Sequence, residues 1–165
     1  MRLLDSMPAV VMACSLTMIQ MTASAVDTWG SGSTTNIESE AKDSLSAARA
    51  AIGRKNWNVA LRELESVVQR EPKNADAHNL LAYSLRNTGN YKRAQTHYEE
   101  ALKLDPNHRG AHEYYGELYL KLNQPDNARK HLLELERICG RNCAEYKDLE
   151  AALANYSKTK NKKAA

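Results

Sequence analysis

The chain has 165 residues, which is enough for one domain with a hydrophobic core. It contains 7 glycines, 4 prolines and no phenylalanine, and alanine, leucine, glutamate, lysine and arginine dominate its second half, so the composition favours helix over strand. The formal net charge is +3 with acidic and basic residues interleaved, a pattern of solvated helix faces that gives no indication of nucleic-acid binding.

Residues 1–25 have the layout of a secretory signal peptide. Arg2 supplies a positive start, residues 7–21 are mostly apolar, and Ala23-Ser24-Ala25 is a small-x-small sequence of the kind that signal peptidase cleaves. We therefore expect export and cleavage after Ala25. The alternative is an uncleaved membrane anchor over residues 7–26, which would make the protein a membrane-tethered assembly factor. The membrane is expected as a partner only in that case.

Two segments lack hydrophobic periodicity. Residues 26–40 are rich in glycine, serine, threonine and asparagine, a composition typical of a flexible linker. Residues 157–165 are rich in lysine and are predicted to form a basic disordered tail.

From residue 41 onward the pattern is helical and is interrupted at regular intervals. Glycine, asparagine or proline, which end helices and form turns, occur at each interruption. The interruptions are residues 53–56, 71–74, 87–90, 105–107 and 122–125. This spacing predicts pairs of helices of about a dozen residues each, joined by short turns.

Key positions recur along the chain with a fixed period of about 34 residues. Ala94 recurs as Ala60 and Ala128, and Pro106 recurs as Pro72. A fixed period of this size indicates a stacked array of helix-turn-helix units, because a single helix pair cannot bury its apolar faces alone. The predicted fold class is therefore an all-α solenoid of three repeats.

The three units resemble tetratricopeptide repeats and cover residues 41–74, 75–108 and 109–142. In the second unit the signature positions are occupied by Leu81, Ala82, Leu85, Gly89, Tyr91, Ala94, Tyr98, Ala101 and Pro106. In the third unit they are occupied by Tyr115, Gly116, Tyr119, Ala128, Leu132 and Leu135. The first unit carries small residues where the family usually has bulky ones. The resemblance implies a non-enzymatic scaffold for protein–protein interaction.

The third unit has Gly140 where a proline would end the repeat, and residues 143–156 are predicted to form a capping helix. The apolar stripe of that helix is Tyr146, Leu149 and Leu153. The ending Cys-Gly-x-x-Cys-x-x-Tyr resembles that of small exported bacterial tetratricopeptide proteins. This resemblance implies a periplasmic location, with an inner-membrane anchor as the alternative.

Cys139 and Cys143 flank the turn before the capping helix. In an oxidising compartment the pair is predicted to form a small structural disulfide that holds the cap. Free thiols are one alternative, and a thiol- or metal-handling site that adds His131 is the other. The cysteines are separated by three residues rather than the two of a thioredoxin-type motif, which disfavours a redox role.

The sequence offers no nucleophile–base pair, phosphate-binding glycine loop or paired-carboxylate motif, so we expect no catalytic residue and no cofactor. His108 and His112 have the spacing of a shared helix face. However, His78 and His112 are separated by one full repeat period, so equivalent packing positions explain His112 without a metal. No metal site is therefore expected.

In this family the first helix of each unit lines a concave face, which binds an extended peptide or a partner's helix. By carry-over of repeat positions, the predicted lining consists of Leu45, Arg49, Asp76, Asn79, Tyr83, Arg86, Glu113, Glu117 and Leu120. Chaperone-tail-binding members use a two-carboxylate clamp of lysine, asparagine and arginine at such positions, and most of that clamp is replaced here. We therefore expect a protein or peptide ligand whose identity the sequence does not give.

Overall fold

The computed structural model of the protein describes residues 44–164, with side chains described as far as residue 162. Within these residues the chain forms seven α-helices and no β-strand, which confirms the predicted all-α fold class. The predicted signal peptide, membrane anchor and linker lie outside the described residues and stay predictions. Among the described helices, none is both long enough and apolar enough to cross a membrane.

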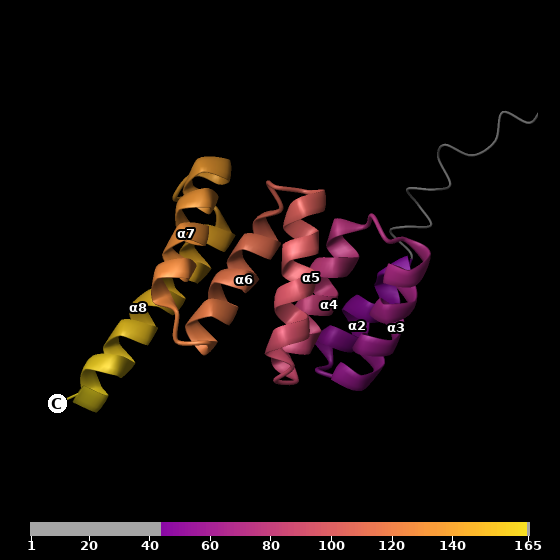
Figure 1. Cartoon of the computed structure of the whole chain (residues 1–165), viewed down its shortest axis with the longest axis horizontal. Helices are drawn as coiled ribbons and strands as arrows, with labels where there is room; N and C mark the ends of the chain where they lie inside the picture. The colour runs from indigo at the N-terminus through magenta and orange to yellow at the C-terminus, as the bar shows by residue number, and fades with distance from the viewer. Residues whose placement is uncertain (1–43, 165) are drawn as a thin grey trace, which may run out of the picture. The chain divides into compact units, whose positions relative to one another are not determined.

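The helices form three antiparallel pairs followed by a single helix (Figure 1). Their bounds are α2 (Ser46–Gly53), α3 (Trp57–Arg70), α4 (Ala75–Asn87), α5 (Tyr91–Leu104), α6 (Arg109–Lys121), α7 (Pro125–Cys139) and α8 (Ala144–Ala164). The pairs α2–α3, α4–α5 and α6–α7 correspond to the three predicted repeats. Each pair packs against the next, and α8 packs on both α6 and α7.

The helices α3, α4, α5 and α6 begin at predicted interruptions where a side chain caps each of them. Asn56, Asn74, Asn90 and His108 each accept a hydrogen bond from the backbone N–H three residues later, over 3.4, 3.0, 3.4 and 3.1 Å. Such a side-chain cap satisfies one of the free N–H groups at a helix start and contributes about 1 kcal/mol. The caps follow the repeat period, since Asn56 corresponds to Asn90 and Asn74 to His108.

Small residues let the helices approach closely. Ala60, Ala94 and Ala128 are fully buried at equivalent places in the second helix of each unit. In the first helices the equivalent small residues are Ala48 and Ala82, both fully buried, and Gly116. A methyl group at Gly116 would meet Leu149 of α8, with its Cβ 2.6 Å from the nearer Leu149 Cδ.

The last helix differs from its prediction. We expected the capping helix to end at residue 156 and residues 157–165 to be disordered, but α8 continues to Ala164. No glycine or proline follows Tyr156 to end the helix. Ser157 and Thr159 donate hydrogen bonds to the carbonyls four residues earlier, over 3.0 and 2.9 Å, and Tyr156 donates to Asn123 Oδ1 over 2.6 Å.

Candidate functional site

A cluster of aromatic and charged side chains joins the first helices of the second and third repeats. The Tyr83 ring of α4 lies 4.7 Å from the Tyr114 ring of α6 and 6.0 Å from the Trp57 ring of α3, centroid to centroid. The Arg86 guanidinium lies 5.2 Å from the Tyr83 ring centroid and forms an ion pair with Glu117. We call these five residues the Tyr83 cluster.

The Tyr83 cluster combines buried charge with partly exposed rings. The Arg86 side chain is only 9% exposed, and that of Glu117 is 29% exposed. Burial raises the pKa of Tyr114 to about 12, so its hydroxyl is neutral at physiological pH. The Arg86 guanidinium lies over the Tyr83 and Tyr114 rings and is paired with the Glu117 carboxylate. These contacts hold the side chain in place, so the cluster forms a rigid surface at the junction of two repeats.

Two hollows adjoin the Tyr83 cluster. Arg86, Glu117 and Lys121 line both of them. The larger has a volume of about 340 Å³ and is closed on one side by α8. Its α8 lining consists of Ala152, Asn155, Tyr156 and Thr159. These α8 residues were missed by the sequence analysis, although their spacing of three and four residues is that of one helix face.

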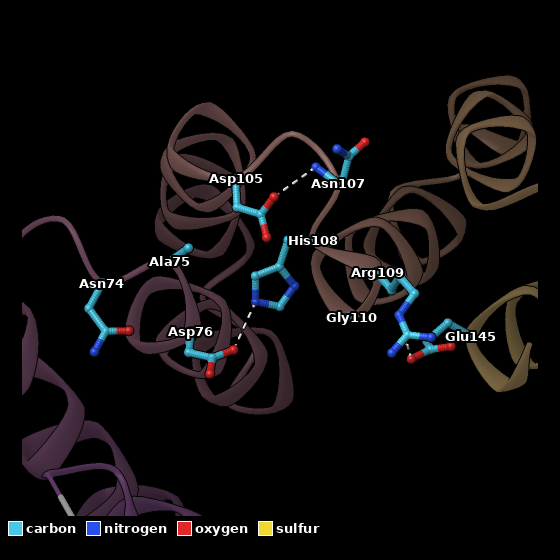
Figure 2. Close-up of a pocket in the computed structure, with 9 residues that line it drawn as sticks. All are labelled: Asn74, Ala75, Asp76, Asp105, Asn107, His108, Arg109, Gly110 and Glu145. Carbon is cyan, nitrogen blue, oxygen red and sulfur yellow. Dashed lines mark hydrogen bonds and ion pairs between the residues drawn. The ribbon is translucent and has the colours of Figure 1, made fainter. Parts of the chain in front are cut away.

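A separate polar pocket of about 500 Å³ lies where α4 and α6 begin (Figure 2). Asp76 accepts from His108 Nε2 over 3.0 Å and is paired with Arg49 over 3.2 Å. Across the pocket, Arg109 of α6 pairs with Glu145 of α8 over 3.6 Å. Hydrogen bonding to His108 outweighs burial and lowers the pKa of Asp76. The pocket is therefore lined by charges that are largely paired with one another.

The predicted lining residues divide into distinct groups. Tyr83, Arg86 and Glu117 belong to the Tyr83 cluster, Leu120 lines the larger hollow beside it, and Asp76 lines the polar pocket with Arg49 paired to it. Asn79 and Glu113 are buried, at 4% and 8% exposure. The partner-binding role of these eight residues stays a prediction.

The remaining member of the predicted lining, Leu45, lies in the apolar core. Leu45 is 3% exposed and packs with Ala48 and Ala51 in the apolar core. Its position corresponds to Asn79 and Glu113 in the later repeats, but the first repeat turns this apolar residue into its own core. Like the equivalent Asn79 and Glu113, Leu45 is buried, and its role in partner binding stays a prediction.

The histidines form a pair in the second repeat that sequence analysis missed. His78 Nδ1 lies 3.1 Å from His97 Nδ1, and His78 Nε2 lies 3.1 Å from the backbone carbonyl of Pro72. Since a carbonyl only accepts, His78 Nε2 carries the hydrogen, and His97 Nδ1–H donates to His78 Nδ1. Burial, followed by the neighbouring His78, lowers the pKa of His97.

The third repeat contains the same arrangement at the equivalent positions. His112 Nδ1 lies 2.9 Å from His131 Nδ1, and His112 Nε2 lies 3.0 Å from the carbonyl of Pro106. The interpretation that His78 and His112 occupy equivalent packing positions is thus confirmed. Burial, followed by the neighbouring His112, lowers the pKa of His131 to about 4. The signal for the pairing was available, because His97 and His131 are also separated by one repeat period.

His131 is therefore not a partner of the cysteines. Among the described residues, the group with the spacing of metal ligands consists of Cys139, Cys143 and Glu145, so the predicted use of His131 in that site is wrong. In the structure the sulfur atoms of Cys139 and Cys143 are within bonding distance, and the two Cα atoms lie 5.9 Å apart, which is an ordinary separation for a disulfide. Oxidation of the pair in the cell stays a prediction.

Known proteins with similar sequences carry the same repeats. Residues 46–135 match the family described as "Anaphase-promoting complex, cyclosome, subunit 3". The TPR repeat-containing thioredoxin TTL4 of Arabidopsis thaliana is 28% identical over 94 residues, which is 57% of this chain and 14% of that protein. Tetratricopeptide repeat protein 37 of Xenopus laevis is 29% identical over 128 residues, which is 71% of this chain and 8% of that protein. The chain thus spans a small part of these relatives.

A solved structure shows the same fold. The TPR2B domain of yeast Sti1, in its complex with pHsp70, superposes with a TM-score of 0.66 at 15% identity. The match covers 73% of this chain and 98% of that domain. At this identity the likeness concerns the fold.

Proposed function

The chain belongs to the tetratricopeptide-repeat family described as "Anaphase-promoting complex, cyclosome, subunit 3", and from this premise we propose that it is a non-enzymatic scaffold. It binds a protein or peptide through the face that carries the Tyr83 cluster and the hollow beside α8. The match covers residues 46–135, which form the repeats, and it does not imply a role in that complex.

The observation that carries the proposal is the continuity of this face. Partly exposed Tyr83 and Tyr114, the Arg86–Glu117 pair and the α8-walled hollow follow one another along α4, α6 and α8. Aromatic residues and arginine dominate the energetics of protein interfaces because they bury a large area with few rotatable bonds. The rigid stack of repeats supports these side chains, so a partner meets a preformed surface.

The location is a second part of the proposal. We infer export to a bacterial periplasm from the signal-like residues 1–25 and from the cysteine-bearing ending of the repeats. In that oxidising compartment Cys139 and Cys143 would be bonded and would fasten α8 to α7. N-terminal sequencing of the exported protein tests this part, since a start at Val26 excludes the membrane-tethered alternative.

Site-specific crosslinking tests the binding face. A photoreactive benzoylphenylalanine replaces Asn155, which is exposed and lines the hollow, and in a matched variant it replaces Leu133 of α7, which is 63% exposed and lies outside it. We expect discrete partner adducts from position 155 and none from position 133. Equal adducts from both positions, or none from position 155, would contradict the proposed face.

A thiol- or metal-handling protein is the second candidate, because Cys139, Cys143 and Glu145 bring three ligand atoms within 4.8 Å of one another. Thiol titration of the purified mature protein separates the two functions. Two reactive thiols together with stoichiometric zinc would favour metal handling, whereas the absence of free thiols favours the structural disulfide.

A further inference from the structure

The hollow that α8 closes has apolar walls. Leu120 of α6 and Ala152 and Tyr156 of α8 line it, and each of these side chains is partly exposed. Its volume of about 340 Å³ lies at the lower end of the roughly 300–1,000 Å³ that ligand-binding pockets span. A hollow of this size and lining accommodates a single large apolar side chain.

The aromatic wall of this hollow is held in place by two contacts. The Tyr156 hydroxyl donates to Asn123 Oδ1, in the turn between α6 and α7, over 2.6 Å. Lys160, one helical turn after Tyr156, has its Nζ atom 5.7 Å from the centroid of the Tyr156 ring. A partner that packs against this ring therefore does not have to order it first, which lowers the entropic cost of binding.

The charged side chains that line the hollow are predominantly positive. Arg86 and Lys121 are the cations, and Glu117 is the carboxylate. The same three side chains line the neighbouring hollow, so both cations face the space that a single ligand would enter. Lys160, placed over the ring of Tyr156, adds a further positive charge beside the wall. The hollow therefore attracts negative charge.

Glu117 does not satisfy all the donors of these cations. It accepts from Nη1 of Arg86, whereas the buried Nε of Arg86 has no hydrogen-bond partner within residues 44–162. The Arg86 side chain is 9% exposed, so its charge is less screened than a charge in open water. Lys121 is exposed, and its Nζ forms neither an ion pair nor a hydrogen bond within the same residues. The positive charge of the hollow is therefore not fully neutralised by the repeats themselves.

We propose that the hollow beside α8 binds an acidic segment of the partner protein. A large apolar side chain of that segment, aromatic or aliphatic, packs against Leu120 and Tyr156, and an adjacent aspartate or glutamate pairs with Lys121. Arg86 is the second cation that attracts this carboxylate, and a basic segment would be repelled. The inference rests on the proposed function and gives its partner a chemistry.

NMR titration of the full-length protein tests the proposal with capped dipeptides that differ in one side chain. The probe is N-acetyl-glutamyl-phenylalaninamide. Its matches carry glutamine or lysine in place of glutamate, or alanine in place of phenylalanine. We expect saturable shifts of the Asn155 side-chain amide, which lines the hollow. The acidic probe should bind about fivefold more tightly than the glutamine probe, which corresponds to one exposed ion pair of about 1 kcal/mol.

Two substitutions separate a local effect of charge from a general one. Lys121→Gln should remove the preference for the acidic probe. Lys147→Gln makes the same change at an exposed residue of α8 that does not line the hollow, and it should keep the preference. Salt at about 1 M should also remove the preference in the parent protein, because the Debye length is then only about 3 Å. Thermal unfolding of each variant shows that it is folded.

The absence of a saturable shift, equal or tighter binding of the glutamine or lysine probe, or a preference retained in Lys121→Gln would overturn the proposal. Equal binding of the alanine probe would overturn the role of the apolar wall. The outcome is separable from that of the proposed function. If crosslinking at position 155 captures a partner while the acidic probe fails to bind, the binding face stands and the acidic chemistry of the partner is wrong.

Discussion

Replacement of Gly116 by alanine tests how closely the last helix is fitted to the repeats. The new Cβ would lie 2.6 and 2.7 Å from the two Cδ atoms of Leu149 and 3.2 Å from its Cγ. Leu149 is fully buried, so its side chain has no open space to move into. Overpacking of this kind costs about 1–3 kcal/mol, whereas glycine to alanine within a helix gains up to about 1 kcal/mol. We expect a net loss of roughly 1–2 kcal/mol in the free energy of unfolding.

Urea denaturation followed by circular dichroism measures this loss, which corresponds to a fall of roughly 3–8 °C in Tm for a domain of this size. Gly53→Ala is the matched control, since a Cβ there meets no atom within 4 Å and the residue ends α2. It should be neutral or slightly stabilising. Adding Leu149→Ala to Gly116→Ala should show favourable coupling between the two sites. A Gly116→Ala variant at least as stable as the parent would refute the argument, because Leu149 would then yield without cost.

Three further substitutions or treatments have expected outcomes. The pKa of Glu113 is raised to about 7 from an ordinary 4.5, so the folded state loses stability as pH rises through this interval. Glu113→Gln should therefore be more stable than the parent at pH 8, by roughly 2–3 kcal/mol in urea denaturation, with no such gain at pH 4.5; equal stability at both pH values would contradict this. The pKa of His131 is lowered to about 4, below its ordinary 6.5, so stability is complete above pH 6.5 and is lost as pH falls from 6.5 towards 4. His131→Gln should reduce the loss of unfolding free energy at acid pH by roughly 2–3 kcal/mol, because the glutamine amide still donates to His112 but takes up no proton. An unchanged dependence of stability on pH would show that His131 is not the group responsible for the loss. Alkylation and mass spectrometry of the exported protein should find Cys139 and Cys143 protected until a reductant is added, and reduction should cost about 2 kcal/mol or less because the closed loop is short; full labelling before reduction would exclude the disulfide.

The fold was predictable because the repeats encode it locally. Ala60, Ala94 and Ala128 have to be small where two helices cross, and Asn56 and Asn90 cap equivalent helices, so both sets recur in the sequence with the repeat period. The histidines recur with the same period, since His112 and His131 stand 34 residues after His78 and His97. To predict that the two histidines of each repeat are in contact, one must know which faces of the two helices meet. The spacing of residues within one helix does not give this information.

The candidate site was predicted less completely for two physical reasons. Repeat position alone does not fix burial, so Leu45 was placed on the binding face although the first repeat uses it in the core. We expected the residues after Tyr156 to be disordered because they are rich in lysine. A lysine-rich composition does not by itself end a helix, however, and α8 continues through them. Because α8 continues, Thr159 becomes part of the wall of the hollow beside the Tyr83 cluster.

The register of α8 has a consequence for how the array of repeats can be lengthened by design. Leu149 and Leu153 stand one repeat period after Tyr115 and Tyr119, and two periods after Leu81 and Leu85, so α8 is the first half of a fourth unit. Lys147 and Glu150 of this helix are exposed. A designed helix packed on α8, with an alanine at the crossing position, would therefore complete a fourth unit on which further repeats could be stacked.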